Sequence, residues 1–600
     1  LDKSVTIGEN WEIIIDFELK PGATEFQFEI LSNPTESYTI DNGGRQIRLN
    51  SKDYQLNNNT LSVNIIIKRT DKNLRPNIAN INLKPKIVEH LTYTYEYNIS
   101  DNKTGYVSDT ERQNLITYHK AVPINNGQIE LELIDNPFMD RPLGTVYEEY
   151  SNGKTEEYQT LFGFNGWKNK SDASYVINTN ENTYAQTLIA NVEDKNNVVI
   201  DLYVDWIPAN VVFVKNDGNS DGTTIENPAD TWNKAIETLK KNKKNAEHAS
   251  DREVNIIVVT GPLNDDGKAL ATEIPFTVTS LYDGVDYRTI ANATITLSKG
   301  VKITNDLQLE YLNVIGSTNY IDTRDELNDN MKYINGNSYN LRIGRGMLPL
   351  NYSTDTTTFG QIQCGGQNNK KFKTVVESGR YCNIYVDRAQ GAGNNTNFSM
   401  NGTLIVGCDY DRYIENGNSN LQIFSKITSR RNKSKNSALD ANSPIYDIYI
   451  KSGMIGIDCF EKYDEAAYSG IYLSGNSGEA ATDYDVGERR LTIEGGKTAN
   501  ITGGLKAYSS DKDSTSTRIY IKGNDASVQN IVGGCVKVKT SSDRIIQVTG
   551  GTIEYSIFSG SNGKDTIKGD IGSLDGNTLV YVGGNAKIGG TNRLTINGSD

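Results

Sequence analysis

The chain has 600 residues, of which 61 are Lys or Arg and 75 are Asp or Glu, so its formal net charge is −14. A chain that is acidic and has no long basic run lacks the electrostatic footprint of a nucleic-acid-binding protein, and we expect no binding to nucleic acid or to an anionic membrane surface. No run of 18 apolar residues is present, so we expect no membrane insertion.

The composition favours an extracellular β protein. Tyr outnumbers Phe by 34 to 14, and Asn, Ser, Thr and Gly are abundant, although AT-rich codon usage would give the same bias. An odd number of cysteines at irregular spacing is neither a disulfide framework nor a metal motif, so we interpret them as small apolar core residues. The five are Cys364, Cys382, Cys408, Cys459 and Cys535.

Residues 1–92 form the first predicted domain. Apolar and polar residues alternate over 11–19 and over 61–67, which is the two-residue period of strands. Turn residues at 20–22 and 41–44 separate the strands. Short strands with regular turns predict a small β-sandwich.

Residues 93–208 form the second predicted domain. It contains a phrase F-x-G-W at 164–167 and a phrase L-Y-x-x-W at 202–206. This pair resembles the Listeria–Bacteroides repeat, a β-grasp-like module of Gram-positive surface proteins, although the usual Gly-Gly opening is missing. The residues that match the repeat are Phe164, Gly166, Trp167, Leu202, Tyr203 and Trp206. We interpret the two Trp as core anchors on adjacent strands, and a carbohydrate-stacking platform is the alternative.

A short helix is predicted at the start of the third domain, residues 209–600. Thr231 is a candidate N-cap, and Trp232, Ile236 and Leu239 fall on one helical face. The order of a strand at 211–214, a D-G-x-x-D-G loop and this helix resembles the entry of right-handed parallel β-helix proteins. The resemblance implies that the helix covers the open end of the coil.

The rest of the third domain is predicted to be a coil of stacked strands. From residue 491 the chain repeats an apolar-x-apolar-x-Gly-Gly phrase, followed by Ile-x-Gly-Gly, at spacings of 28 (519−491) and 27 (546−519) residues. Strands and corners at a fixed long period are typical of a β-solenoid. The array is similar to those of large Firmicute surface proteins. The chain ends inside such a phrase and begins without Met, as expected of a processed protein or a fragment.

Alternation also predicts which repeat residues point into the coil. The residues predicted to face inward are Ile519, Ile521, Ile546, Val548, Val580 and Val582. Tyr449, Tyr520 and Tyr581 each take the middle position of such a phrase and are predicted to point outward. Stacked outward Tyr could bind a glycan or a protein, and stacking without any ligand is the alternative.

A loop before the predicted helix has oxygen side chains at alternate positions, Asp217, Asn219 and Asp221. This spacing matches the start of an EF-hand loop, but Pro228 stands where that loop needs Glu, so an EF-hand is rejected. We therefore expect no cofactor, with a loose Ca²⁺ site and a solvated turn as the two interpretations of the loop.

Asp409 and Asp411 lie in an acidic cluster of the predicted coil. Paired carboxylates can cleave glycosidic bonds, and parallel β-helices host glycosidases and lyases. The polygalacturonase phrases N-T-D and G-H-G are missing, and the three His residues all precede residue 250. The sequence therefore leaves enzyme activity open and favours its absence, because a fold alone does not carry function.

The sequence as a whole predicts an all-β protein with two small β modules followed by a long β-helix. We expect a secreted, extracellular surface protein of a Gram-positive bacterium that acts as an adhesin or a spacer. Its partner would be a host or bacterial glycan or a surface protein. A polysaccharide-degrading enzyme is the second hypothesis, and a phage tail-spike-like receptor-binding protein is the third.

Overall fold

The computed structural model divides into two compact units, residues 1–137 with 142–208, and residues 138–141 with 209–600. In the first unit the structure describes the strands given below. In the second it describes residues 209–245, 254–264, 270, 274–297, 301–316, 333–347, 361–365, 372–386, 402–407, 421–428, 444–457, 470–473, 488–503, 516–534, 543–559 and 578–589. Among the described residues, no helix is long and apolar enough to cross a membrane.

The first unit consists of strands. Its largest sheet has the order β10-β11-β14-β7-β1-β4-β3, with β8 paired to β7, and the smaller sheets have the orders β12-β13-β9 and β2-β5-β6. The strands are β1 (Glu9–Asp16), β2 (Phe26–Ile30), β3 (Tyr38–Asp41), β4 (Gln46–Asn50), β5 (Leu61–Arg69), β6 (Asn77–Leu83), β7 (Lys86–Glu96), β8 (Ile116–His119), β9 (Gln128–Leu133), β10 (Leu143–Glu149), β11 (Thr155–Asn169), β12 (Ile177–Thr179), β13 (Gln186–Asn191) and β14 (Val198–Pro208).

Strand β7 links the two predicted N-terminal domains. It runs across residue 92, pairs antiparallel with β1 and pairs parallel with β14. Trp167 lies on β11 and Trp206 on β14, and these strands pair antiparallel, as predicted for two Trp on adjacent strands. The side chains of both Trp lie outside the described residues.

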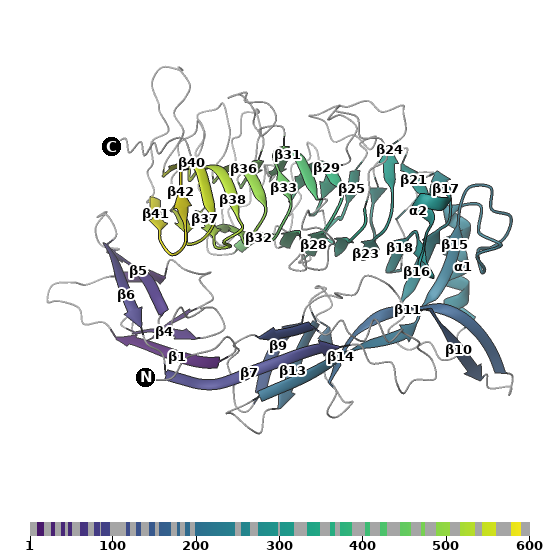
Figure 1. Cartoon of the computed structure of the whole chain (residues 1–600), viewed down its shortest axis with the longest axis horizontal. Coiled ribbons are helices and arrows are strands. Elements are labelled where there is room, and N and C mark those ends of the chain that lie inside the picture. Colours follow the sequence, from purple (N-terminus) through teal and green to yellow (C-terminus); the bar gives the residue numbers. More distant parts are fainter. Residues whose placement is uncertain are drawn as a thin grey trace, which may run out of the picture. The chain divides into compact units, whose positions relative to one another are not determined.

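The second unit contains a long parallel sheet of 12 strands, which we call sheet 1 (Figure 1). Its strands, in spatial order, are β15 (Asn210–Val214), β16 (Asn255–Val259), β18 (Phe276–Thr279), β23 (Leu307–Leu309), β26 (Leu341–Ile343), β28 (Phe372–Val376), β30 (Gly402–Val406), β32 (Pro444–Ile450), β35 (Glu488–Ile493), β37 (Ser516–Ile521), β39 (Arg544–Val548) and β41 (Thr578–Val582).

A second long parallel sheet, sheet 2, runs beside it (Figure 1). Its strands are β22 (Val301–Lys302), β25 (Tyr333–Asn335), β27 (Gln361–Gln363), β29 (Arg380–Tyr385), β31 (Gln422–Thr428), β33 (Met454–Ile455), β34 (Gly470–Tyr472), β36 (Lys497–Thr502), β38 (Ser527–Val532), β40 (Thr552–Phe558) and β42 (Lys587–Ile588). A short third sheet contains β17 (Pro262–Asn264), β21 (Thr294–Leu297) and β24 (Val314–Gly316). Because the chain visits sheets 1 and 2 alternately, each pass is one coil of a solenoid.

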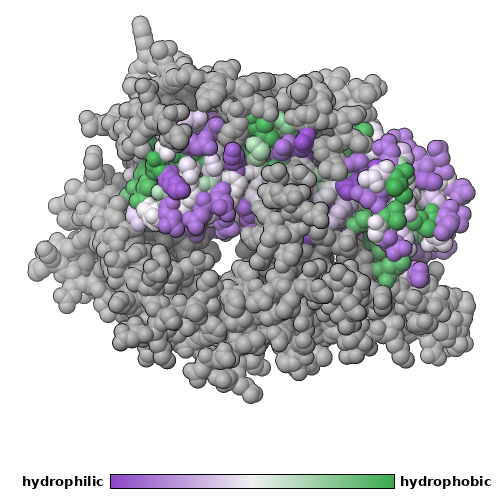
Figure 2. Space-filling view, viewed as in Figure 1, coloured by the Kyte–Doolittle hydropathy of each residue, from purple (hydrophilic) through white to green (hydrophobic). Residues whose placement is uncertain are grey.

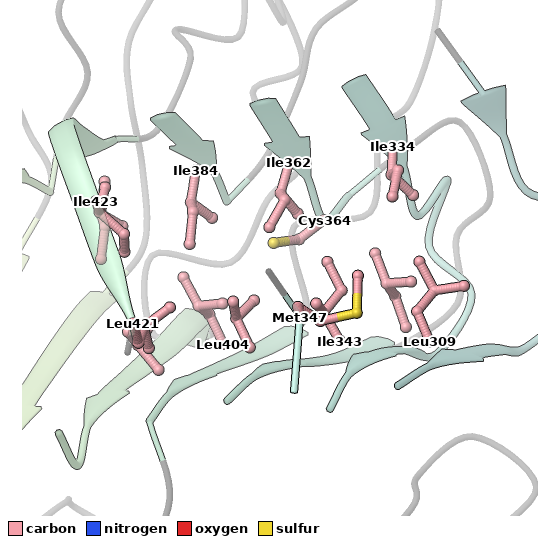
Figure 3. Packing of buried hydrophobic residues seen from close by; sticks show 14 of the residues in the cluster. Leu309, Ile334, Ile343, Met347, Ile362, Cys364, Ile384, Leu404, Leu421 and Ile423 are labelled. Atoms are coloured by element: carbon pink, nitrogen blue, oxygen red, sulfur yellow. The ribbon is translucent and has the colours of Figure 1, made fainter. Parts of the chain in front are cut away.

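One apolar interior runs between the two sheets. Ile343 and Leu404 of sheet 1 face Ile362 and Ile384 of sheet 2 (Figure 3). Cys364 is a free cysteine with no exposed surface in this interior, as predicted, and Cys382 is half-buried. The other three cysteines lie outside the described residues. A continuous core of this kind stabilises each coil only through its neighbours.

The predicted inward register is correct over most of the repeats. The side chains of Ile519, Ile521, Ile546 and Val548 have no exposed surface and belong to this core. Val580 is partly buried against the core, whereas Val582, on the last described strand of sheet 1, is 44% exposed. The sequence phrase is the same in each coil, but Val582 has strand β39 on one side only.

Glycines make the corners between the sheets, as predicted. Gly495 and Gly496 join β35 to β36, and Gly496 has a φ of +79°. A Cβ atom added at Gly496 would lie 2.6 Å from the carbonyl oxygen of Gly453 in the preceding coil. The corner therefore needs glycine both for its left-handed backbone and for the close approach of the neighbouring coil.

Helix α1 (Trp232–Asn245) closes the first coil next to strand β15 (Figure 1). The Thr231 hydroxyl oxygen accepts a hydrogen bond from the Lys234 amide at 3.4 Å, which agrees with its predicted N-cap role. Trp232 and Leu239 are buried in the core, and Ile236 packs against it. The Trp232 ring lies 6.0 Å from the ring of Phe276. The predicted face of this helix therefore covers the apolar end of the coil.

Replacing Trp232 by Ala should strongly destabilise the second unit. The substitution leaves a cavity between α1 and Phe276, and core Trp-to-Ala changes cost about 3–5 kcal/mol. Urea denaturation of the whole chain should show the loss, and aggregation should increase because the first strand edge is less protected. The control is Glu237→Ala on the exposed side of α1. Equal stability of the two variants would contradict a capping role.

Replacing Gly496 by Ala should cost more than replacing Gly284 by Ala. Both residues have positive φ, but a Cβ at Gly284 would meet no atom within 4 Å. The change at Gly284 should cost about 1–2 kcal/mol for the backbone conformation alone. The change at Gly496 adds the clash with Gly453, so its urea midpoint should be clearly lower.

Candidate binding surface

The three predicted Tyr lie in one column on the outer face of sheet 1, the side away from the core. The pairing of β32, β35, β37, β39 and β41 places them in register. The order of the column is Tyr449, Thr492, Tyr520, Gln547 and Tyr581. Tyr residues therefore occupy every second coil, at a spacing of about 9–10 Å along the coil axis. They do not stack ring upon ring, because Thr492 and Gln547 stand between them.

All three Tyr point outward as predicted, but the middle of this Tyr column is covered. Tyr520 is 1% exposed and Gln547 is 4% exposed, whereas Tyr449 and Tyr581 are half-buried. The Lys522 ammonium lies 5.3 Å from the centre of the Tyr520 ring, within cation–π range. Alternation correctly gave the direction of these side chains, but it carries no information on what lies over a sheet.

A second column follows the ends of the same strands and alternates in charge, with Lys451, Glu494 and Lys522. Backbone hydrogen bonds continue the register, since the Glu494 amide donates to Ile450 at 2.8 Å and the Lys522 amide to Ile493 at 2.9 Å. The Lys451 ammonium is 3.9 Å from the Glu494 carboxylate. These side chains keep more exposed surface than the Tyr520 ring, with 41% for Glu494. The column is therefore an accessible rim beside the Tyr column.

A third column lies on the other side of the Tyr column. Asp447, Arg490 and Arg518 are in register on β32, β35 and β37. The Arg490 guanidinium is 4.0 Å from the Asp447 carboxylate, and both arginines are buried. The outer face of these coils is thus a grid of aromatic and charged side chains, three columns wide.

Nearer the start of the coil, charged side chains on the outer face of sheet 1 are buried and link adjacent coils. Arg342 on β26 donates a hydrogen bond of 2.7 Å to Glu377, and both side chains are less than 10% exposed. Gln308 on β23 donates to Glu310 at 2.8 Å. A buried ion pair of this kind connects adjacent coils and does not offer accessible charge to a partner.

The predicted Ca²⁺ loop holds helix α1 in place. Asp221 accepts hydrogen bonds from the Thr223 amide at 3.2 Å and the Thr223 hydroxyl at 2.9 Å, which together hold the pKa of its carboxyl below the usual value. The Asp221 carbonyl accepts a hydrogen bond from the Thr238 hydroxyl of α1 at 2.7 Å. Asp217 has a φ of +60° in the turn. These contacts are those of a turn that positions a helix, and the Ca²⁺ site stays a prediction.

An open hollow of about 380 Å³ lies between this loop and α1. Its walls carry both signs of charge, and two of the predicted metal residues take part in it. The lining residues are Asn219, Ser220, Asp221, Lys234, Glu237, Thr238 and Lys241. Lys234 and Lys241 oppose the binding of a cation between the two carboxylates.

Asp409 and Asp411 lie outside the described residues, so their predicted pairing is not placed. Over the parts of the chain that the structure describes, no group of three or more His, Cys, Asp or Glu side chains could hold a metal ion. Sequence reasoning missed the Lys451, Glu494 and Lys522 column. The signal for this column was the charged residue that directly follows the apolar-x-apolar phrases ending at Ile450, Ile493 and Ile521.

Comparison of the chain with family models, with curated proteins and with solved structures finds no match.

Glu377→Gln should destabilise the coil far more than Glu494→Gln. Removing one partner of a buried ion pair takes away the counter-charge of the other, and such a change costs about 3–5 kcal/mol. The exposed Lys451–Glu494 pair should contribute less than about 1 kcal/mol. Urea denaturation of both variants measures the difference, and similar midpoints would show that the Arg342–Glu377 pair is not important for stability.

Proposed function

We propose that this chain is a non-enzymatic, secreted surface protein of a Gram-positive bacterium, in which the coil is both a spacer and a binding element. In this proposal the second unit is a right-handed parallel β-helix capped by α1. The first unit provides a β-sandwich and a β-grasp-like module. The partner is a glycan or a surface protein on a host or a bacterial cell, and the protein acts in the extracellular space or the cell wall.

The observation that supports binding is the grid on the outer face of β32, β35, β37, β39 and β41. Tyr rings recur at every second coil, and on β32, β35 and β37 charged side chains stand in the columns on both sides. Aromatic rings with polar tips can contact sugar faces or a protein surface, and flanking charges add specificity. A long ligand that follows the coil axis would meet the same groups repeatedly, so weak contacts would add up.

The observation that supports a spacer is the length of sheet 1. Twelve parallel strands in one sheet span about 50 Å at the usual strand spacing. A single core connects all the coils, so the element is stiff along this length. A stiff element holds a binding face at a fixed distance from whatever carries it.

The accessible members of the grid should carry the binding. The chain should bind members of a glycan or surface-protein array, and Tyr581→Ala, Tyr449→Ala and Lys451→Glu should each weaken binding by about two- to tenfold. The control is Tyr555→Ala, which removes a 42% exposed Tyr from sheet 2. Loss of binding in the control and not in the three variants would show that the ligand does not bind on sheet 1.

The same ligands also test the enzymatic alternative. Polysaccharides incubated with the chain should show neither new reducing ends nor the absorbance of unsaturated products. Cleavage that disappears in Asp409→Asn or Asp411→Asn would overturn the non-enzymatic proposal, because these two residues are among the best catalytic candidates predicted from the sequence.

A further inference from the structure

A hollow lies between helix α1 and the loop before it, on the first coil. Its volume of about 380 Å³ falls within the range of about 300–1,000 Å³ that is usual for ligand pockets. Hydrophilic residues surround the apolar ones on the described surface of the first coils (Figure 2). Residues 219–221 of the loop form one wall of the hollow, and Lys234, Glu237, Thr238 and Lys241 form the other. Positions three and four apart lie on one side of a helix, so these four side chains face the same space.

The two walls of the hollow are fixed to each other. The Thr238 hydroxyl of α1 donates a hydrogen bond of 2.7 Å to the Asp221 carbonyl of the loop. The Ser220 amide donates to the Pro228 carbonyl at 3.3 Å, which ties the loop to the segment before the helix. The loop backbone is also closely packed, since a Cβ atom added at Gly218 would lie 2.4 Å from the Pro228 carbonyl oxygen. A ligand therefore meets a preformed hollow, and its binding does not require the loop to become ordered.

Several polar groups of the hollow are available to a ligand. Within the described part of the chain, the side chains of Asn219, Glu237 and Lys241 make no hydrogen bond or ion pair. The hydrogen bonds that the Asp221 carboxylate accepts there, from Ser220 and Thr223, all go to its Oδ1 atom and leave Oδ2 open. The hollow therefore presents one amide, one ammonium group and two carboxylates with open acceptor positions.

The chemistry of these walls excludes most classes of ligand. Lys234 and Lys241 oppose a metal cation, and Asp221 and Glu237 oppose an inorganic anion. Among the described residues that line the hollow, none is aromatic or aliphatic, so an apolar ligand is excluded as well. A sugar ring carries hydroxyl groups that both donate and accept hydrogen bonds, and it can therefore satisfy the carboxylates, the ammonium group and the amide together. The methylene stems of the two lysines offer apolar surface to its C–H groups.

We propose that this hollow is a binding site for a neutral sugar unit, held by hydrogen bonds to Asn219, Asp221, Glu237 and Lys241. The two carboxylates accept hydrogen bonds from neighbouring hydroxyls of the sugar. The Lys241 ammonium group and the Asn219 amide donate hydrogen bonds to other oxygens of the same ring. This site is built on the capping helix and its loop and shares no residue with the grid on β32 to β41, so neither proposal depends on the other.

Methyl glycosides of glucose, galactose, mannose and N-acetylglucosamine are the probes for this site. Saturation-transfer NMR with the whole chain should show saturable binding of at least one of them in the millimolar range, because each solvent-exposed hydrogen bond contributes little net free energy. Sodium sulfate and calcium chloride at the same concentration should not displace the bound glycoside, because the walls carry both signs of charge. Addition of EDTA should leave the binding unchanged, because no metal ion takes part in it.

Variants identify the groups responsible. Glu237→Gln, Lys241→Ala and Asn219→Ala should each weaken the binding of the glycoside about two- to fivefold, as expected for the loss of one exposed hydrogen bond. Glu226→Gln and Lys302→Ala are the matched controls, since they remove an exposed carboxylate and an exposed ammonium group outside the hollow. Thermal unfolding of each variant checks that the fold is retained, and all five side chains are exposed, so we expect little change.

Four results would overturn the site. The first two are no saturable binding of any of the four glycosides, and equal weakening in the hollow and control variants. The third is binding that disappears with EDTA, which would assign the contact to a bound cation. The fourth separates the hollow from the grid, since binding that is lost in Tyr581→Ala and kept in the hollow variants would place the sugar on sheet 1.

Discussion

The parallel pairing of coil upon coil in sheets 1 and 2 is the constraint on which the second unit depends. Each strand can place its Ile or Val side chains in the core only if the preceding corner brings the strand into the right register with its neighbour in the sheet. Gly496 meets this need because its left-handed backbone and missing side chain let the corner lie against Gly453. A larger residue at this corner would clash with the backbone of the neighbouring coil.

The fixed interior leaves the outer face free to vary. Because alternate residues point to opposite sides, a change at Tyr449 or Glu494 leaves the core residues beside it in place. The outer face has therefore been used in two ways along one sheet. The Arg342–Glu377 pair is buried and links two coils, whereas Lys451 and Glu494 keep exposed surface. A repeating fold can in this way combine a stabilising stretch and a recognition stretch on one continuous surface.

Departures from the repeat add local features that the coil cannot provide. Helix α1 covers the first strand of sheet 1, whose edge and apolar interior would otherwise be open. A short hairpin of β19 (Leu281–Tyr282) and β20 (Val285–Asp286) interrupts the coil between β18 and β21, where an insertion does not disturb the register of the sheets. The loop with Asp221 serves the first of these features, since its carbonyl holds Thr238 of the helix. Oxygen-rich loops at such places need not be metal sites.

The sequence by itself determined the repeat, the inward residues such as Ile519 and Val548, the glycine corners and the capping face of Trp232, because each follows from local periodicity and backbone preference. It also determined that Tyr520 points away from the core. That Tyr520 is covered while Glu494 is exposed, and that Arg342 meets Glu377, follows only from the tertiary structure. The Arg342–Glu377 contact joins residues 35 positions apart (377−342), and the exposure of Tyr520 and Glu494 depends on what packs over a sheet. No local pattern encodes either.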